Sequence, residues 1–160
     1  MKKLNLITPI LYCLILFISS CGGTDTKTED GSTTAKSVDE RHIGEWKGTD
    51  YSGKLESLIL DKSNHAVLVQ DNQVIVGKEF ELNKIKAECK YDIDYSKNPI
   101  WLDLVIYEQG KTQELGRLKG IVRFITDNKI EYRLNFAGER FDKFDPEDKE
   151  STIVLDKVTN

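Results

Sequence analysis

The sequence holds few of the residues that enzymes most often use for catalysis or metal binding. Its 160 residues include only two histidines, His42 and His65, and three cysteines. Neither histidine belongs to a cluster with zinc-ligand spacing. The chain also has no Gly-rich phosphate-binding loop and no nucleophile elbow. We therefore expect no enzymatic activity, no metal and no cofactor, and we expect both histidines to lie on the surface without a function.

The sequence also lacks a block of positive charge. Its 23 Lys and Arg residues are interleaved with 27 Asp and Glu residues, and the formal net charge is −4. Proteins that bind nucleic acid independently of its sequence rely on a concentrated basic surface. Nucleic acid is therefore not an expected partner.

Carboxylates are abundant, but their order does not indicate a site. Asp92, Asp94 and Asp103 could in principle pair as a general acid and base. Asp92 and Asp94 alternate with apolar residues, however, which indicates a solvated outer face. The charged residues 141–150 lack the Asp-x-Asp-x-Asp-Gly order of an EF-hand calcium loop. We expect a solvated loop there.

The N-terminal residues form the strongest single pattern. Two lysines precede an apolar run over residues 4–18, and two serines then lead into Cys21. A charged, an apolar and a small-residue region in this order are typical of a secretory signal. Residues 18–21 resemble the lipobox of bacterial lipoproteins, which implies that Cys21 is lipidated and anchors the chain to a membrane. The alternative is a membrane-spanning helix, but that needs about 20 apolar residues and this run is shorter.

This pattern divides the chain into three parts. We expect residues 1–20 to be the signal peptide, residues 21–40 the lipidated cysteine and a flexible tether, and residues 41–160 a single domain. The tether is rich in Gly, Ser, Thr and charged residues and nearly free of large apolar side chains. Gly22 is not the aspartate that often retains lipoproteins at the inner membrane. In a bacterium with two membranes we therefore expect the outer membrane.

The cysteines agree with export and add no chemistry. Cys13 would leave with the signal peptide and Cys21 would carry lipid, so Cys89 would remain alone without an intramolecular disulfide. Cys89 is in phase with the apolar residues of the alternating segment 85–95. Because free Cys is among the most buried residue types, we expect an inert core thiol.

From residue 43 onward the dominant pattern is the period-two alternation of half-buried strands. Short Asx- and Gly-containing segments separate the runs and favour hairpins. The expected strands cover residues 45–49, 54–60, 65–70, 73–78, 85–95, 100–107, 113–125, 130–136 and 152–158. Eight or nine strands in meander order predict an all-β, antiparallel up-and-down barrel, whose closure removes exposed edges. A two-sheet sandwich is the alternative.

A family resemblance supports the barrel. Gly44-Glu45-Trp46 matches the Gly-x-Trp that opens lipocalin barrels. The C-terminal half is similar to the planctomycete-type lipocalin-like domain of uncharacterised bacterial lipoproteins. The similar stretches are residues 91–103, 120–124, 133–140 and 151–157. The resemblance implies a lipocalin-like barrel in which Trp46 plugs the closed end, and it implies no particular activity.

The aromatic residues are the candidates for a ligand site. A small barrel either fills its interior with side chains or leaves room for one small ligand. The aromatic residues that could line the interior are Trp46, Tyr91, Tyr95, Trp101, Phe124, Tyr132 and Phe136. The candidate ligand contacts among them are Trp46, Tyr91, Trp101, Phe124 and Tyr132.

Two functional hypotheses follow from the sequence. The first is a membrane-anchored, non-enzymatic binding module for a small apolar or amphipathic ligand. The second is an envelope accessory protein with a filled barrel, which would bind a protein partner through loops around residues 138–150.

Overall fold

The computed structural model describes residues 39–136 and 138–159. The expected signal peptide, Cys21 and all but the last two residues of the expected tether lie outside the described residues. The described chain is all-β, as predicted, and its strands form one antiparallel sheet. The ten strands are β1 (Gly44–Thr49), β2 (Leu55–Leu60), β3 (Ala66–Gln70), β4 (Gln73–Val76), β5 (Phe80–Leu82), β6 (Ile85–Asp94), β7 (Ile100–Glu108), β8 (Glu114–Thr126), β9 (Lys129–Asn135) and β10 (Thr152–Lys157).

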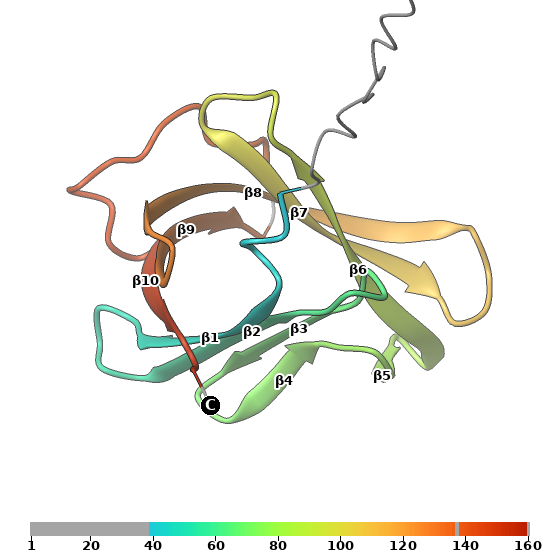
Figure 1. Ribbon diagram of the computed structural model, residues 1–160. Coiled ribbons are helices and arrows are strands. Elements are labelled where there is room, and N and C mark those ends of the chain that lie inside the picture. The colour runs from blue at the N-terminus through green and yellow to red at the C-terminus, as the bar shows by residue number, and fades with distance from the viewer. Residues whose placement is uncertain (1–38, 137, 160) are drawn as a thin grey trace, which may run out of the picture. The chain divides into compact units, whose positions relative to one another are not determined.

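The sheet is rolled into a nearly closed barrel (Figure 1). Strands β1 to β4 and strands β5 to β10 each pair with their neighbours in sequence, and β10 pairs with β1. Backbone hydrogen bonds bridge the remaining gap: Cys89 N–H donates to Gly77 O (2.7 Å) and Tyr91 N–H donates to Asn64 O (3.1 Å). The predicted antiparallel barrel is confirmed, and a single continuous sheet excludes the sandwich.

The structure has ten strands, where the sequence predicted eight or nine. The nine expected runs coincide with β1 to β4 and β6 to β10, with small shifts at their ends. The additional strand, β5, spans only 3 residues and pairs with the start of β6. An alternating pattern cannot be recognised over so short a segment. The predicted count is therefore corrected to ten.

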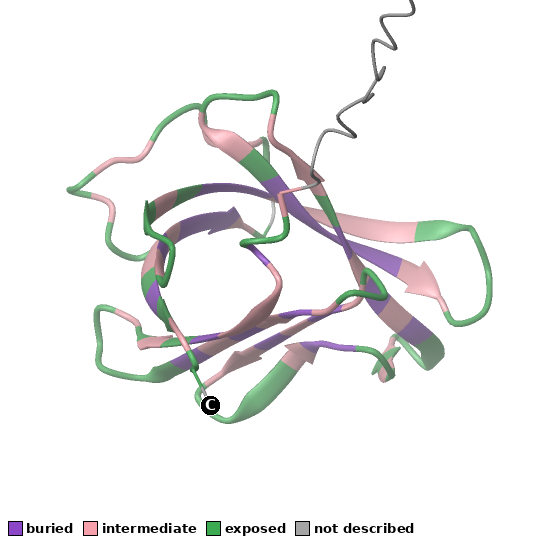
Figure 2. Cartoon of the chain, in the orientation of Figure 1, coloured by how far each residue is buried: buried purple, intermediate pink, exposed green. Residues whose placement is uncertain are grey.

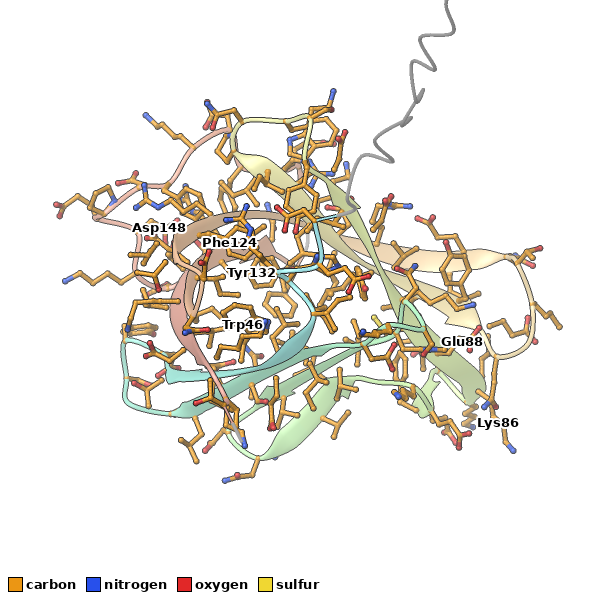
Figure 3. The ribbon with its side chains drawn as sticks, in the orientation of Figure 1. Trp46, Lys86, Glu88, Phe124, Tyr132 and Asp148 are labelled. Atoms are coloured by element: carbon orange, nitrogen blue, oxygen red, sulfur yellow. The ribbon has the colours of Figure 1, made fainter. Side chains whose placement is uncertain are left out.

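Buried residues alternate with more exposed ones along several strands, as the burial colours show (Figure 2). Most of the buried apolar residues form one core cluster. Trp46 and Tyr132, the largest fully buried side chains, lie inside, whereas Lys86 and Glu88 lie on the outside (Figure 3). Cys89 is also fully buried, and this burial raises the pKa of its thiol to about 12. The predicted core position of Cys89 is confirmed.

Three hairpin turns share the sequence Asp-x-Ser. In each turn, Oδ1 of the aspartate accepts hydrogen bonds from the backbone N–H and from the hydroxyl of the serine two residues later, at 2.6–2.9 Å. The pairs are Asp50–Ser52, Asp61–Ser63 and Asp94–Ser96. Such side-chain bonds stabilise the turn backbone, so these motifs fix the β1–β2, β2–β3 and β6–β7 connections.

Gly48 is required where β1 pairs with β10. It lies opposite Leu155 in the register of the two strands. A Cβ atom at position 48 would lie 2.2 Å from the carbonyl oxygen of Val154 and 3.1 Å from Leu155 Cδ2. The first obstruction is backbone, so a larger residue would have to push the two strands apart.

We expect Gly48→Ala to lower the free energy of unfolding by about 3 kcal/mol, because overpacking against backbone cannot be relieved by a rotamer change. Chemical denaturation measures the effect. Gly116→Ala is the matched control in β8, since the nearest atom to its Cβ would be Ile106 Cδ1 at 4.0 Å. Equal stability of Gly48→Ala and the wild type would contradict the tight approach of β1 and β10.

Candidate functional site

One end of the barrel is closed by Trp46 and by the segment that precedes β1. Trp46 Nε1 donates a hydrogen bond to the carbonyl oxygen of His42 (2.8 Å). Its ring meets Phe124 edge-on, with 6.4 Å between centroids. Lys157 Nζ lies 5.0 Å from the Trp46 ring centroid and donates to the carbonyl oxygen of Arg41 (2.9 Å). These contacts hold the segment before β1 against the barrel and leave Trp46 with no exposed surface.

His42 is buried at the same end, so the expectation that it lies on the surface is wrong. Its Nδ1 lies 2.9 Å from the Tyr95 hydroxyl, and its Nε2 lies 3.2 Å from the Tyr91 hydroxyl. Tyr91 donates its proton to the carbonyl oxygen of Asp61 (2.8 Å), so it accepts from Nε2–H, and Nδ1 accepts from Tyr95. The neutral imidazole satisfies both bonds, and burial lowers the pKa of His42.

This lowered pKa predicts a loss of stability on mild acidification. Below the ordinary histidine pKa of about 6.5, the unfolded chain binds a proton at His42 more readily than the folded chain does. The free energy of unfolding should therefore fall as the pH is lowered from 7 towards 5. We expect His42→Gln to be less stable than the wild type at pH 7, by about 1–2 kcal/mol, because it loses hydrogen bonds. On acidification, however, its free energy of unfolding should fall less than that of the wild type. Thermal unfolding across this range tests the difference, with His65→Gln as the control for removing the other histidine.

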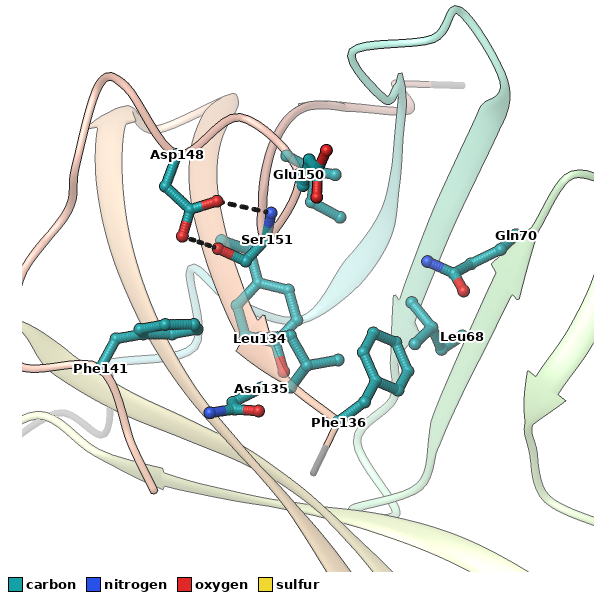
Figure 4. Close-up of a pocket in the computed structure, with 11 residues that line it drawn as sticks. Leu68, Gln70, Leu134, Asn135, Phe136, Phe141, Asp148, Glu150 and Ser151 are labelled. Atoms are coloured by element: carbon teal, nitrogen blue, oxygen red, sulfur yellow. Dashed lines mark hydrogen bonds between the residues drawn. The ribbon is translucent and has the colours of Figure 1, made fainter. Parts of the chain in front are cut away.

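The opposite end of the barrel holds a pocket of about 280 Å³ (Figure 4). Inward side chains of β3, β9 and β10 form its walls, together with the segment between β9 and β10. Tyr132 is fully buried among the lining residues, and Phe136 is half exposed. The apolar and aromatic lining residues are Leu68, Tyr132, Leu134, Phe136, Phe141 and Ile153, and the polar ones are Gln70, Asn135, Asp148, Glu150 and Ser151.

Arg133, on the outer face of β9, fastens the segment that forms one wall of this pocket. Its guanidinium pairs with Asp148, donates to the carbonyl oxygen of Lys143 (2.6 Å) and lies 3.7 Å from the Phe141 ring centroid. Asp148 also accepts a hydrogen bond from the Ser151 hydroxyl at 2.6 Å (Figure 4). Ser151 and Arg133 together lower the pKa of Asp148 to about 2. The wall is therefore held by charge-assisted bonds at several points.

A second arginine, Arg140, holds the same segment over β7 and β8. It pairs with Asp103 through Nη2–Oδ2 at 2.8 Å, and it donates to the carbonyl oxygen of Gly120 at 2.7 Å. Burial alone would raise the pKa of Asp103, but Arg140, the Gly120 N–H and Arg117 hold it below its ordinary value. The Arg140 guanidinium also lies 4.2 Å from the ring centroid of Trp101. Trp101 is therefore on the outer face, and the prediction that it lines the interior is wrong.

The other four predicted ligand contacts are divided between the two ends of the barrel. Tyr132 lines the pocket. Trp46, Tyr91 and Phe124 belong to the other end, where Trp46 and Tyr91 bond to protein groups. Phe124 also lines an open hollow of about 610 Å³ together with Arg41 and Phe144.

Of the pocket residues that the sequence analysis missed, Leu68, Leu134 and Ile153 are apolar residues in the inward phase of their strands, whereas Phe141, Asp148, Glu150 and Ser151 come from the segment between β9 and β10. The apolar residues among them could have been found by taking, on each strand, the inward-facing residues at the end far from Trp46.

Glu56 is a buried carboxylate of β2 that is not among the residues lining the pocket. It lies in the inward phase of β2, opposite Gly48 of β1 and opposite Gln70 of β3. Glu56 is only 3% exposed, and no donor among the described residues forms a hydrogen bond with its Oε2. Burial raises the pKa of Glu56, against the opposing effect of a hydrogen bond from Gln70. Gln70 itself lines the pocket.

A serine, a histidine and a glutamate also lie close together at the β2–β3 turn. Ser63 Oγ is 3.0 Å from His65 Nδ1, and His65 Nε2 is 3.4 Å from Glu88 Oε2. Ser63 donates its hydroxyl proton to Asp61 Oδ1 (2.7 Å), so that proton does not point to His65. This arrangement stabilises a turn and does not prepare a serine nucleophile.

Wider comparisons give no further assignment. Within residues 39–136 and 138–159, no three His, Cys, Asp or Glu side chains are grouped so that they could hold a metal ion. The same part of the chain contains no helix with the length and apolar character needed to cross a membrane. No protein-family model, curated protein or solved structure matches the chain. The barrel, its pocket and the N-terminal pattern are therefore the features that bear on function.

Proposed function

We propose that the chain is a non-enzymatic binding protein whose barrel takes up one small apolar or amphipathic molecule. The observation that carries this proposal is the difference between the two ends of the barrel. At the Trp46 end the tryptophan is fully buried and the hollow beside it is lined by charged side chains such as Arg41, Arg123 and Asp142, whereas the other end keeps a mainly apolar and aromatic pocket of about 280 Å³. That volume is near the lower limit of ligand pockets, about 300 Å³, and suits a compact molecule better than a long acyl chain.

The resemblance to lipocalin-like domains supports this proposal. Gly44-Glu45-Trp46 opens β1, and Trp46 lies at the closed end, which is the role that the resemblance implies for it. The meander order of the strands and their closure through β10 and β1 suit a barrel of this kind. We therefore propose a lipocalin-like barrel as the ligand-binding unit.

We further propose that the domain works at a membrane surface, in the envelope of a bacterium. The support is the pattern of two lysines, an apolar run and two serines before Cys21. Stable anchoring needs more than one acyl chain, and lipidation at a lipobox cysteine supplies two or three. The outer membrane is the proposed destination, because Gly22 follows Cys21 in place of a retention aspartate.

Metabolic labelling tests the anchor. Cells that express the full chain are grown with an alkyne-tagged palmitate. We expect the wild-type chain to carry the label, and we expect Cys21→Ser to abolish it. Cys13→Ser is the matched control and should keep the label, because it lies within the apolar run. A label that persists in Cys21→Ser would contradict lipidation at this residue.

A second candidate function is that of an envelope accessory protein. The observation that favours it is an exposed apolar surface on the outside of β2 and β4, where Leu55 and Val74 are each 59% exposed. Residues 138–150, which the sequence suggested as the binding patch, are instead fastened to the barrel by Arg133 and Arg140. The proposed protein contact is therefore better placed on β2 and β4.

Native mass spectrometry of the full chain, isolated from its own host in lipid nanodiscs, distinguishes the two candidates. We expect a one-to-one small-molecule adduct that disappears on denaturation. Ile153→Trp places an indole in the pocket and should reduce the adduct about tenfold or more, since it removes the space for the ligand. Ile125→Trp makes the same change at a half-exposed position outside the pocket and should keep the adduct. A wild-type mass without an adduct would contradict the binding proposal.

A further inference from the structure

A second hollow, of about 610 Å³, opens on the surface beside the Trp46 end of the barrel. Its walls come from the segment before β1, the β6–β7 connection, β8 and the segment between β9 and β10. The volume lies within the range of small-molecule sites, about 300–1,000 Å³. No described residue lines both this hollow and the pocket at the opposite end, so the two are separate sites.

The charged residues of this hollow are mainly cationic. Arg41, Arg123 and Lys143 line it, and Asp142 is the one carboxylate among the lining residues that the structure describes. In the same part of the chain, no Lys, Arg or His lines the pocket at the opposite end. The hollow therefore favours an anionic group, which the pocket does not.

Arg41 is held against one wall of the hollow. Its guanidinium lies 4.5 Å from the ring centroid of Phe124, and its Nη2 pairs with Asp39 Oδ2 at 2.7 Å. Its Nη1 approaches Asp127 Oδ1 at 3.5 Å, and the Asp127 side chain is 82% exposed. That approach is longer than a normal hydrogen bond, so Nη1 remains available to a ligand.

Arg123 is held in a similar way on a second wall. Its guanidinium lies 4.5 Å from the ring centroid of Phe144, and its Nε and Nη2 pair with Glu131. Within the described residues its Nη1 forms no hydrogen bond, so this N–H group is also available. A guanidinium that is already stacked and paired loses little side-chain entropy when it binds a ligand.

Lys143 supplies a third cation, on an exposed side chain that can turn towards a ligand. Asp39 and Glu131 cancel part of the charge of the arginines, but ion pairs at exposed arginines are weak, so a ligand anion can compete for the guanidinium groups. A phosphate group presents three oxygens and up to two negative charges. It therefore suits three cations better than a carboxylate does.

Most of the remaining lining residues are apolar. Pro99 precedes β7, Ile100 opens it, and Val122 lies in β8. Together with the rings of Phe124 and Phe144, they place apolar surface next to the cations. Inorganic phosphate would leave this surface uncovered, whereas a phosphate ester of an apolar chain would cover it.

We propose that this hollow is a second ligand site, which binds the phosphate group of a small amphipathic phosphate ester. Arg41, Arg123 and Lys143 bind the phosphate oxygens, and the apolar chain lies against Ile100 and Val122. This inference does not depend on the role proposed for the pocket at the opposite end, because the two sites share no described lining residue.

The test compares butyl phosphate with butanol, butyrate and inorganic phosphate. The full chain in dodecyl maltoside micelles, with ¹³C-labelled Ile and Val methyl groups, is titrated with each probe while the Ile100 and Val122 signals are followed by NMR. Dodecyl maltoside carries no phosphate, so the detergent does not compete for the site. We expect butyl phosphate to bind about tenfold more tightly than butanol, the ratio that one charge-assisted hydrogen bond provides, and butyrate to bind between the two. Inorganic phosphate should bind about tenfold more weakly than butyl phosphate, because it buries no apolar chain.

Nanodiscs distinguish the two sources of such an ester. Ile100 and Val122 signals that shift when phosphatidic acid is added to phosphatidylcholine nanodiscs would identify the ester as a lipid headgroup. If butyl phosphate shifts these signals and phosphatidic acid does not, the ester is a water-soluble molecule.

Arg123→Gln tests the role of the arginine itself. It removes a guanidinium from a side chain that is 56% exposed, so butyl phosphate should bind about tenfold more weakly while butanol is unchanged. Lys143→Gln should weaken butyl phosphate about threefold, because solvent screens an exposed lysine. Lys149→Gln is the matched control, since it removes the same charge from the same segment and Lys149 does not line the hollow. An unshifted Ile153 methyl signal in each free variant shows that the variant keeps the wild-type fold.

Each part of the inference can fail separately. Butanol or butyrate binding as tightly as butyl phosphate would overturn the phosphate assignment, and inorganic phosphate binding as tightly would overturn the role of the apolar chain. Ile100 and Val122 signals that no probe shifts would overturn the site itself. A loss of affinity for Lys149→Gln as large as that for Arg123→Gln would indicate attraction by overall charge and would overturn the placement of the phosphate at Arg123.

Discussion

The backbone pairing between β1 and β10 is the contact on which the rest of this structure depends. It joins the first and the last strand of the described chain and places Trp46 opposite Lys157 and Gly48 opposite Leu155. Without it the ten strands would form an open sheet whose apolar face has no partner. Because the two strands are far apart in sequence, this contact is also among the most costly in loop entropy. The close fit at Gly48 shows how little space the closure leaves.

Closure creates two ends, and the side chains make them chemically different. At one end, Trp46 and the buried His42 network satisfy their own polar groups within the protein. At the other end the inward residues include Leu68, Leu134 and Ile153, and they leave a pocket between them. The arginine contacts of the segment between β9 and β10 hold a wall at this end. A closed end that holds the strands together and an open end with a mixed polar and apolar pocket suit a small ligand-binding barrel.

Much of the fold could be predicted from the sequence, because period-two alternation directly reports one buried face. That signal identified nine strands and placed Cys89 in the core. It failed for Trp101, since residues 100–107 are almost continuously apolar and either phase could face inward. Asp103 is in the same alternating phase as Trp101, and a charged residue in that phase indicates that the phase faces outward. His42 lies before the first strand, where the sequence has no periodicity, so its burial could not be predicted from a local pattern. The anchoring of residues 138–151 depends on contacts between residues that are distant in sequence, so it could not be predicted from a local pattern either.

The most direct test of this account is an experimental electron-density map of the chain purified from its own host membranes. The account predicts density for a compact non-protein molecule between Leu68 and Ile153, two residues that line the pocket. It also predicts no such density in contact with Trp46. A map in which protein side chains fill the space between Leu68 and Ile153 would contradict it.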